Sequence, residues 1–272
     1  MTKTELVIHF LDIGQGDTIL GILPHGQGCF MVDVAESDDT SKMLLENGDV
    51  EFILITHSHA DHVGGLHALI RDSNIIPKAI YLNYDRGPGS KPTLLYKELL
   101  RNLFFWCTHY GIKILPIHSG ISFSLSDVLF DVLAPDYAFL GYCIANNSIN
   151  DSSVVVKVNY LGNSLVLTGD IEADGIVQLF NSDKRGCLAD IDIIKIPHHG
   201  GVTLEPFSQL IQTINPKFAV ACLAKINKYN HPNKDIIQFL EKKGIKIVYT
   251  YEHPTEPHPT FLFGENGITL KA

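Results

Sequence analysis

Four side chains that can bind a metal ion stand close together in the segment 57–62: His57, His59, Asp61 and His62. They directly follow an apolar stretch, 51–55, whose composition predicts a buried strand. Residues two apart in an extended segment point to the same side, so His57 and His59 can face one point in space. Asp61 and His62 enter the next helix and can face a second point. Neutral imidazole and carboxylate suit zinc, manganese or iron, so the spacing predicts a metal site.

Three other predicted strands end in residues of the same kind. Asp33 follows one strand, Asp170 follows another, and the pair His198-His199 follows a third. Loops at strand ends converge in layered α/β folds, so we expect these side chains to meet at one edge of the sheets. The expected ligands of a first metal are His57 and His59, those of a second metal are Asp61, His62 and His198, and Asp170 bridges the two.

Two divalent ions that share a carboxylate form a hydrolytic site. Such ions activate a water molecule near neutral pH and polarise the bond under attack. The sequence therefore predicts a metal-dependent hydrolase that takes two divalent ions, zinc or manganese.

The composition restricts the choice of partners. The net charge of the 272 residues is −9, which argues against strong non-specific binding of nucleic acid, because such binding needs a basic surface. A phosphodiester substrate stays possible, since bound metals supply positive charge locally. The five cysteines are scattered and odd in number, which indicates neither a disulfide framework nor a zinc knuckle.

The chain shows no sign of a membrane or secretory segment. No apolar run approaches about 18 residues, and the first residues do not resemble a signal peptide. We therefore expect a cytoplasmic protein with no membrane partner, and the oligomeric state stays open.

Strands and helices alternate along the whole chain. Apolar runs between turn residues predict strands, and stretches with helical spacing predict helices. The predicted strands are Leu6–Leu11, Thr18–Leu23, Cys29–Val34, Phe52–Ile55, Ala79–Leu82, Ile112–Ile117, Val128–Leu133, Val154–Tyr160, Ser164–Thr168, Ile191–Ile196, Phe218–Cys222 and Lys246–Tyr249. The predicted helices are Ser41–Glu46, Val63–Arg71, Thr93–Tyr110, Ala173–Asn181, Glu205–Thr213 and Lys234–Lys242.

These elements predict one α/β domain with two similar halves, roughly 1–125 and 126–272. Each half combines strands with its own helices, so we expect two sheets packed face to face with helices outside, a four-layer αββα sandwich. The histidines and prolines of the segment 252–259 resemble a further ligand cluster, but the prolines favour an extended loop before final strands.

The chain resembles the metallo-β-lactamase fold superfamily, whose His-x-His-x-Asp-His motif matches residues 57–62. Within it, the chain is most similar to the β-lactamase-like domain of ComEC-type competence proteins. The motifs that carry this similarity occur in order at 10–17, 150–153, 167–172, 196–200 and 230–232. The resemblance implies a phosphodiester substrate, hydrolysed by a nuclease or by a small-molecule phosphodiesterase. Single-stranded DNA, a cyclic nucleotide and a phosphorylated headgroup all fit that class.

Two features differ from the resembled proteins. The membrane channel of ComEC proteins has no counterpart here, so we expect a free-standing relative without a role in DNA uptake. Most members of the superfamily also place a third histidine on the first metal, where this chain has Asn150. An asparagine carbonyl is a weaker ligand, so the first metal is expected to be loosely held, to be manganese, or to be lost. The other interpretation makes Asn150 a turn residue that bonds its own backbone.

Five further residues receive roles as hypotheses. Asp33 is expected to hold the ligand loop without touching a metal. Asp17 either closes a hairpin or reaches the floor of the site. His199 is expected to point away from the metals, as a hydrogen-bond partner or a substrate contact. Asp61 would orient the nucleophile, and His231 would protonate the leaving group.

Two other functions compete with the phosphodiesterase. The same metal site serves a carbonyl-centred hydrolase, such as a lactonase, thioesterase or lactamase, although Asn150 and the segment 198–200 count against it. A module that binds a metal or nucleotide without turnover is the third interpretation.

Overall fold

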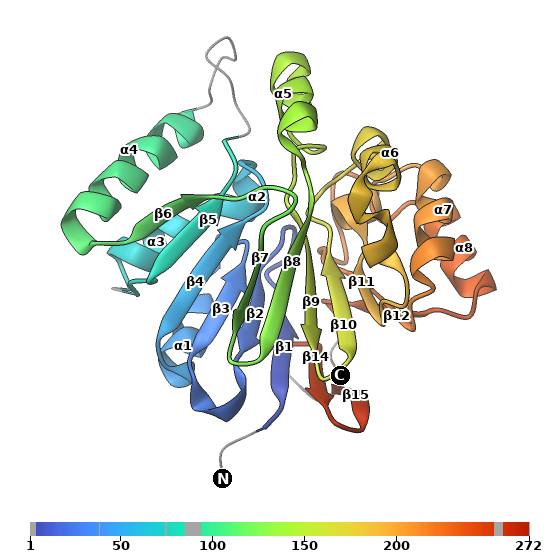
Figure 1. The fold of residues 1–272 in the computed structure, drawn as a ribbon, viewed down its shortest axis with the longest axis horizontal. Helices are drawn as coiled ribbons and strands as arrows, with labels where there is room; N and C mark the ends of the chain where they lie inside the picture. The colour runs from blue at the N-terminus through green and yellow to red at the C-terminus, as the bar shows by residue number, and fades with distance from the viewer. Residues whose placement is uncertain (1–3, 38, 74, 85–93, 253–257, 272) are drawn as a thin grey trace.

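Two β-sheets pack face to face, and helices cover both outer faces (Figure 1). The computed structural model describes residues 4–37, 39–73, 75–84, 94–252 and 258–271. The four-layer αββα sandwich predicted from the sequence is confirmed.

In the described part of the chain, the first sheet has eight strands in the order β15-β14-β1-β2-β3-β4-β5-β6. Strands β3 to β6 run parallel to one another, whereas the neighbours on the β1 side pair antiparallel. The carboxyl ends of β3 and β4 therefore lie at the same edge. The strands are β1 (Leu6–Phe10), β2 (Ile19–Ile22), β3 (Cys29–Val32), β4 (Val50–Ile55), β5 (Ala79–Leu82), β6 (Lys113–Pro116), β14 (Thr260–Gly264) and β15 (Gly267–Lys271).

The second sheet has the order β13-β12-β11-β10-β9-β8-β7. Strands β10 to β13 are parallel, so the segments that follow β10 and β11 also emerge at one edge. The strands are β7 (Ser122–Leu125), β8 (Val128–Ala134), β9 (Val155–Tyr160), β10 (Asn163–Leu167), β11 (Ile193–Lys195), β12 (Phe218–Ala221) and β13 (Lys246–Tyr249). The C-terminal strands β14 and β15 return to the first sheet, so both ends of the described chain build that sheet.

Helices lie on each outer face. The first sheet is covered by α1 (Asp39–Asn47), α2 (Ala60–Val63), α3 (Leu66–Arg71) and α4 (Leu94–Tyr110). The second is covered by α6 (Ala173–Asn181), α7 (Leu204–Ile214) and α8 (Lys234–Lys242), whereas α5 (Tyr137–Asn146) stands above the sheets in Figure 1. Short 3-10 turns occur at η1 (Pro24–Gly26), η2 (Asp183–Leu188) and η3 (Pro197–Gly200). Within the described residues, none of the helices combines the length and apolar character that a membrane crossing requires.

Strand β4 shows why the sequence folds into this sandwich. Phe52 and Leu54 point between the two sheets, and Ile53 and Ile55 point toward the covering helices. A central parallel strand is buried on both faces, which explains its continuous apolar sequence. Across the sheet interface, Phe52 packs edge-on against Phe130 of β8, with ring centroids 5.2 Å apart. Aromatic pairs of this geometry add to the stabilisation from buried area.

Three elements differ from the sequence prediction. The helix expected over 63–71 is interrupted, because Gly65 donates its backbone N–H to the carbonyl of Val34 at 2.9 Å instead of continuing the helix. Strand β7 is short and lies at a sheet edge, which explains its weak apolar signal. Helix α5 begins where the carboxylate of Asp136 accepts the N–H of Phe139 at 2.7 Å, an N-cap that the sequence analysis missed.

The loop predicted over 252–259 lies mostly outside the described residues. His258 is described and buried, and its Nδ1 accepts the backbone N–H of Asp12 at 3.0 Å. This contact ties the start of β14 to the segment that follows β1.

Candidate metal centre

Asp33 anchors the loop that carries the predicted ligands. It follows β3, and its carboxylate accepts the backbone N–H and the hydroxyl of Thr56, each at 2.7 Å. The same carboxylate lies 2.7 Å from Nδ1 of His62. An Nδ1–H that donates to a carboxylate fixes the imidazole so that Nε2 faces away from it, the arrangement common to metal-binding histidines. Asp33 thus holds the loop from behind and orients His62.

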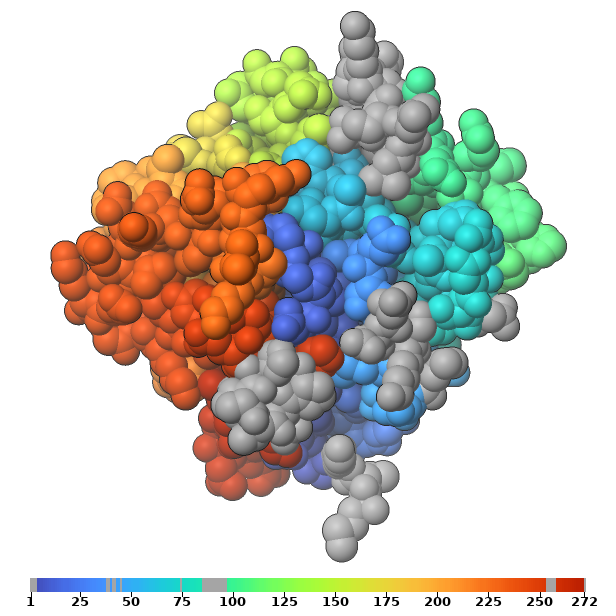
Figure 2. Space-filling model, turned by 180° about the vertical axis from the view of Figure 1, so that it is seen from behind, coloured from blue at the N-terminus to red at the C-terminus, as the bar shows by residue number. Residues whose placement is uncertain are grey.

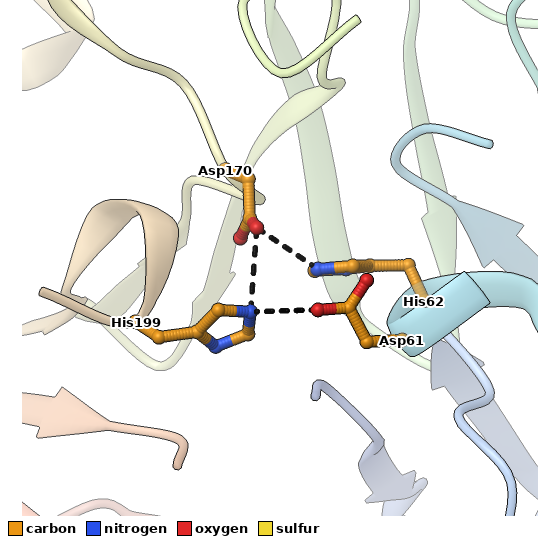
Figure 3. A group of neighbouring side chains, drawn as sticks. All are labelled: Asp61, His62, Asp170 and His199. Carbon is orange, nitrogen blue, oxygen red and sulfur yellow. Dashed lines mark ion pairs between the residues drawn. The ribbon is translucent and has the colours of Figure 1, made fainter. Parts of the chain in front are cut away.

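Four side chains converge in front of this loop: Asp61, His62, Asp170 and His199 (Figure 3). One ligand atom from each lies within 4.8 Å of all the others. Oδ2 of Asp170 lies 3.2 Å from Nε2 of His62 and 3.3 Å from Nε2 of His199. Asp61 approaches the same nitrogen of His199 at 3.5 Å. The ends of β4, β10 and β11 therefore meet as predicted, and we call these four residues the Asp/His group.

The position of His198 and His199 corrects the sequence prediction. His199, not His198, joins the Asp/His group, because its Nδ1 donates to the carbonyl of Cys222 at 2.7 Å and its Nε2 faces Asp170. His198 turns instead toward Glu172, with Nδ1 at 3.0 Å from Oε1. The prediction assumed that the extended strand continues, whereas both histidines have left-handed φ angles, 48° and 53°. Because of this turn, His199 points toward the Asp/His group, and His198 points away from it.

His57 and His59 lie next to each other, beside the Asp/His group. Nε2 of His57 is 3.1 Å from Nδ1 of His59, and the ring of His57 lies 4.2 Å from that of His62. Burial and the neighbouring His62 hold the pKa of His57 well below its usual range, so its imidazole is neutral. Among the described residues, these two rings do not form a compact group of their own with an acidic side chain.

Asn150 does not use its side chain to close a turn. Its Nδ2 donates to Oε1 of Glu172 at 2.8 Å and lies 3.5 Å from Nε2 of His198. Its Oδ1 is buried and has no hydrogen-bond partner in the described structure. Hydrogen bonds from His198 and Asn150 lower the pKa of Glu172. Glu172 therefore positions both neighbours, a role that the sequence analysis did not assign although the residue stands in a recognised motif.

The floor of the site contains a buried lysine that the sequence analysis missed. Nζ of Lys195 lies 2.5 Å from Oδ2 of Asp17 and 3.1 Å from Oδ1 of Asp170. Although burial opposes the charge, Asp17 and Asp170 raise the pKa of Lys195. Asp17 thus reaches the floor of the site, one of its two expected roles. The sequence did contain a sign of this ion pair. Lys195 stands in an apolar predicted strand, and a charge that is buried there requires a partner.

The Asp/His group has the composition and charge that a divalent cation requires. The Nε2 atoms of His62 and His199 are buried and make no well-aligned hydrogen bond to any described residue. Although burial opposes protonation, Asp170 and Asp17 raise the pKa of His199 to about 9, and acidic neighbours also raise that of His62. The carboxylates therefore favour positive charge at this point, and a metal ion that displaces the protons would supply it.

A second group, formed by Asp17, Asp33 and His62, has the same kind of composition. Both groups are consistent with divalent metals. In the second, however, Asp17 already pairs with Lys195, and Asp33 already accepts hydrogen bonds from Thr56. The first group is therefore the better candidate for a metal.

The family model of the metallo-beta-lactamase superfamily matches residues 13–105. Over these residues the sequence is similar to the metallo-β-lactamase superfamily, and the fold is that of a solved metallo-β-lactamase fold protein, YhfI from Bacillus subtilis. ComE operon protein 3 of Bacillus subtilis (strain 168) is 25% identical over 276 residues, which cover 93% of this chain and 33% of that protein. The chain therefore spans about a third of the length of this curated relative.

Two solved structures share the fold. Igni18, a metallo hydrolase from Ignicoccus hospitalis KIN4/I, superposes with a TM-score of 0.57 at 14% identity, over 95% of this chain and 99% of Igni18. A diphosphatase from the PhnP family gives a TM-score of 0.53 at 12% identity, over 97% of this chain and 98% of the diphosphatase.

A cavity of about 330 Å³ opens in front of the Asp/His group. It is lined by Gln15, His59, Ala60, Asp61, Asn150, Asp170, His198, His199, Tyr229 and His231. The lining thus joins segments from both halves of the chain. The two halves also lie side by side on the surface of the molecule. In Figure 2, orange segments of the C-terminal half lie directly beside blue segments of the N-terminal quarter.

His231 reaches the cavity from the loop before α8. Its ring centroid lies 5.4 Å from that of His198. Burial and the two neighbouring histidines, His198 and His199, lower its pKa. His231 is therefore a neutral imidazole at neutral pH in the free protein, placed at the rim of the site.

Proposed function

We propose that this protein is a metal-dependent phosphodiesterase. The observation that carries the proposal is the set of polar side chains around the cavity: His198, His231 and Asn150 line it beside the Asp/His group. A phosphodiester under attack has two non-bridging oxygens and a leaving oxygen, and each gains from a hydrogen-bond donor. A carbonyl group develops charge on one oxygen. Three polar groups around one cavity therefore suit phosphorus better than a lactone, thioester or lactam.

Two sets of residues would hold divalent ions, zinc or manganese. The Asp/His group would hold one ion, and His57 and His59 would hold the other. The carbonyl oxygen of Asn150, which has no hydrogen-bond partner among the described residues, would join His57 and His59. When bound, such ions supply an activated water and neutralise charge on the phosphoryl oxygens. They also supply the positive charge that the protein, at −9, lacks for an anionic substrate.

Asp61 is suited to orient the attacking water. Although burial opposes ionisation, the nearby imidazoles of His199 and His62 lower the pKa of Asp61 to about 2. Asp61 is therefore a carboxylate throughout the physiological range, and a third of its side chain is exposed to the cavity (33%). An ionised carboxylate is a strong acceptor, so it would fix the water with its lone pair toward phosphorus.

His231 is suited to protonate the leaving oxygen. It is neutral in the free protein because burial and two histidines lower its pKa. An anionic phosphodiester bound beside it would raise that pKa, because a nearby negative charge favours the protonated imidazole. Binding of the substrate would thus favour protonation of His231, which would then donate this proton to the leaving oxygen.

The test is hydrolysis of bis-(p-nitrophenyl) phosphate by protein stripped with a chelator and reloaded with zinc or manganese. We expect turnover only after reloading, and its loss in Asp170→Asn. Asp127→Asn is the matched control, because Asp127 is exposed and its φ of 64° suits asparagine. If lactones or thioesters are hydrolysed and the phosphodiester is not, a carbonyl-centred hydrolase replaces the proposal. Metal binding without turnover of any of these substrates would indicate a non-catalytic module.

A further inference from the structure

The loop between β12 and α8 is built around one asparagine. Nδ2 of Asn227 donates to the carbonyl of His231 at 2.8 Å, and Oδ1 accepts the backbone N–H groups of His231 at 3.0 Å and Tyr229 at 3.2 Å. Nδ2 also donates to the carbonyl of Ala224 at 3.2 Å, so one side chain satisfies four backbone groups of the loop. Such a network fixes the loop in one conformation, so the position of Tyr229 is determined by the fold.

Tyr229 presents an aromatic ring at the rim of the cavity. Its ring is nearly parallel to that of His231, with centroids 5.6 Å apart and planes 14° apart. Tyr229 is 50% exposed, although it also lines the cavity. The exposed ammonium of Lys228 lies 5.0 Å from the ring centroid. The aromatic ring of Tyr229 thus lies next to the imidazole of His231 and the ammonium of Lys228. These groups stand beside the cavity that is proposed to bind the phosphodiester.

Two glycines bring this loop against the metal centre. A Cβ on Gly201 would lie 2.3 Å from Cε1 of His231, and one on Gly200 would lie 2.4 Å from Cβ of Pro232. Only glycine leaves enough space for the loop to approach so closely. The two glycines directly follow His198 and His199, so the segment that presents these histidines also seats Tyr229.

We propose that Tyr229 is a stacking platform for a nucleobase attached to the phosphodiester, with Lys228 free to pair with an adjacent phosphate. This proposal rests on the proposed phosphodiesterase function. A nucleobase is the planar group that accompanies phosphodiesters in nucleotides and nucleic acids, and every base has a face that an aromatic side chain can stack on. A headgroup without a ring gains nothing from the platform. Tyr229 therefore selects nucleotide esters over other phosphodiesters.

The test compares two esters with the same leaving group. Thymidine 5′-(p-nitrophenyl phosphate) carries a base, and methyl p-nitrophenyl phosphate carries none. We expect the metal-loaded protein to prefer the thymidine ester in kcat/KM. Tyr229→Ala should reduce that preference about tenfold, as loss of one stacked base does, whereas Tyr229→Phe should retain it. Tyr110→Ala is the control, because Tyr110 is a partly exposed tyrosine at the end of α4.

A binding measurement separates this proposal from the proposed function. Fluorescence anisotropy of labelled oligothymidylate and of an abasic oligomer of equal length is recorded with metal-free protein. We expect the bases to tighten binding in the parent protein and in Tyr229→Phe, but not in Tyr229→Ala. An unchanged ester preference in Tyr229→Ala, or equal binding of both oligomers by the parent, overturns the platform. If neither ester is hydrolysed while base-dependent binding requires Tyr229, the phosphodiesterase fails and the platform stands.

Discussion

Lys195 and Asp17 form a buried ion pair between the two sheets, with Nζ of Lys195 2.5 Å from Oδ2 of Asp17 and both side chains 1% exposed. Asp17 stands just before β2 of the first sheet, and Lys195 ends β11 of the second. Lys195 also contacts Asp170, so the pair connects the floor of the site to the Asp/His group. The charge of Lys195 partly balances the carboxylates that gather there.

Replacing Lys195 is expected to destabilise the fold strongly. Lys195→Met leaves Asp17 buried without its partner, and uncompensated buried charges cost about 3–5 kcal/mol in the free energy of unfolding. Urea denaturation of metal-free protein measures this loss. The double variant Asp17→Asn/Lys195→Met should recover part of it, because the unpaired charge is removed.

Lys217 provides the matched control for that experiment. Its Nζ lies 2.7 Å from Oδ1 of Asp192, but the lysine side chain is 71% exposed. Lys217→Met should therefore cost less than about 1 kcal/mol, as exposed ion pairs do. Equal losses in the two lysine variants would contradict the structural role of the buried pair.

His199 and His198 are expected to differ in metal binding although they are adjacent. His199→Ala removes one member of the Asp/His group, so the reloaded variant should retain about one metal ion fewer per chain after gel filtration. His198→Ala should keep the metal content of the parent, because its Nδ1 faces Glu172. Elemental analysis of both variants measures the difference. The reverse pattern would support the assignment made from the sequence.

Gly201→Ala is expected to displace the proposed general acid without unfolding the protein. The new Cβ would clash with the ring of His231, which is the movable end of a side chain. Misplacement of a catalytic group by about 1 Å can cost about 100-fold, so kcat should fall by about that factor. Gly141→Ala is the control, because no atom of the described residues lies within 4 Å of a Cβ at that position in α5. The substrate for this test is a dinucleotide, whose alkoxide leaving group needs a proton, and an unchanged kcat in Gly201→Ala would argue against His231 as the acid.

The fold and the convergence of the strand ends could be predicted, because both follow from local patterns. Apolar runs defined β4 and β5, and the position of Asp170 after β10 placed it near the ligand loop. The roles of His198 and His199 could not be read from spacing, because two consecutive left-handed residues decide them. Such a turn depends on tertiary contacts, here the hydrogen bond from His199 to the carbonyl of Cys222.

Contacts between distant segments were equally hidden in the sequence. Glu172 acquires a role only when His198 and Asn150 reach it from other parts of the chain. The stacking of Tyr229 on His231 likewise depends on a loop that Asn227 folds. Lys195 was the exception, since a charged residue within an apolar strand by itself indicates a buried partner of opposite charge.

Asn150 offers a direct test of the first metal position, which is proposed to be held by His57 and His59. Its Oδ1 is buried and has no hydrogen-bond partner among the described residues, which suits a weak ligand. Imidazole binds zinc-like ions more strongly than an amide carbonyl. Asn150→His should therefore retain more metal than the parent after dialysis, with the total content nearer two ions per chain. Asn150→Ala should lose the weaker ion and keep the one in the Asp/His group.

The contrast with Glu172 shows whether Asn150 binds metal or only supports His198. Glu172→Gln keeps the shape of the side chain but weakens its hydrogen bonds with His198 and Asn150, because a neutral amide is a poorer acceptor than a carboxylate. If Asn150 binds metal through Oδ1, Glu172→Gln should weaken that ion less than Asn150→Ala does. Competition titrations with a fluorescent zinc chelator rank the two variants. If both variants lose the same amount of metal affinity, Asn150 acts through Glu172 and His198 and does not bind the ion itself. Of the residues proposed for the first metal, only His57 and His59 would then remain as ligands.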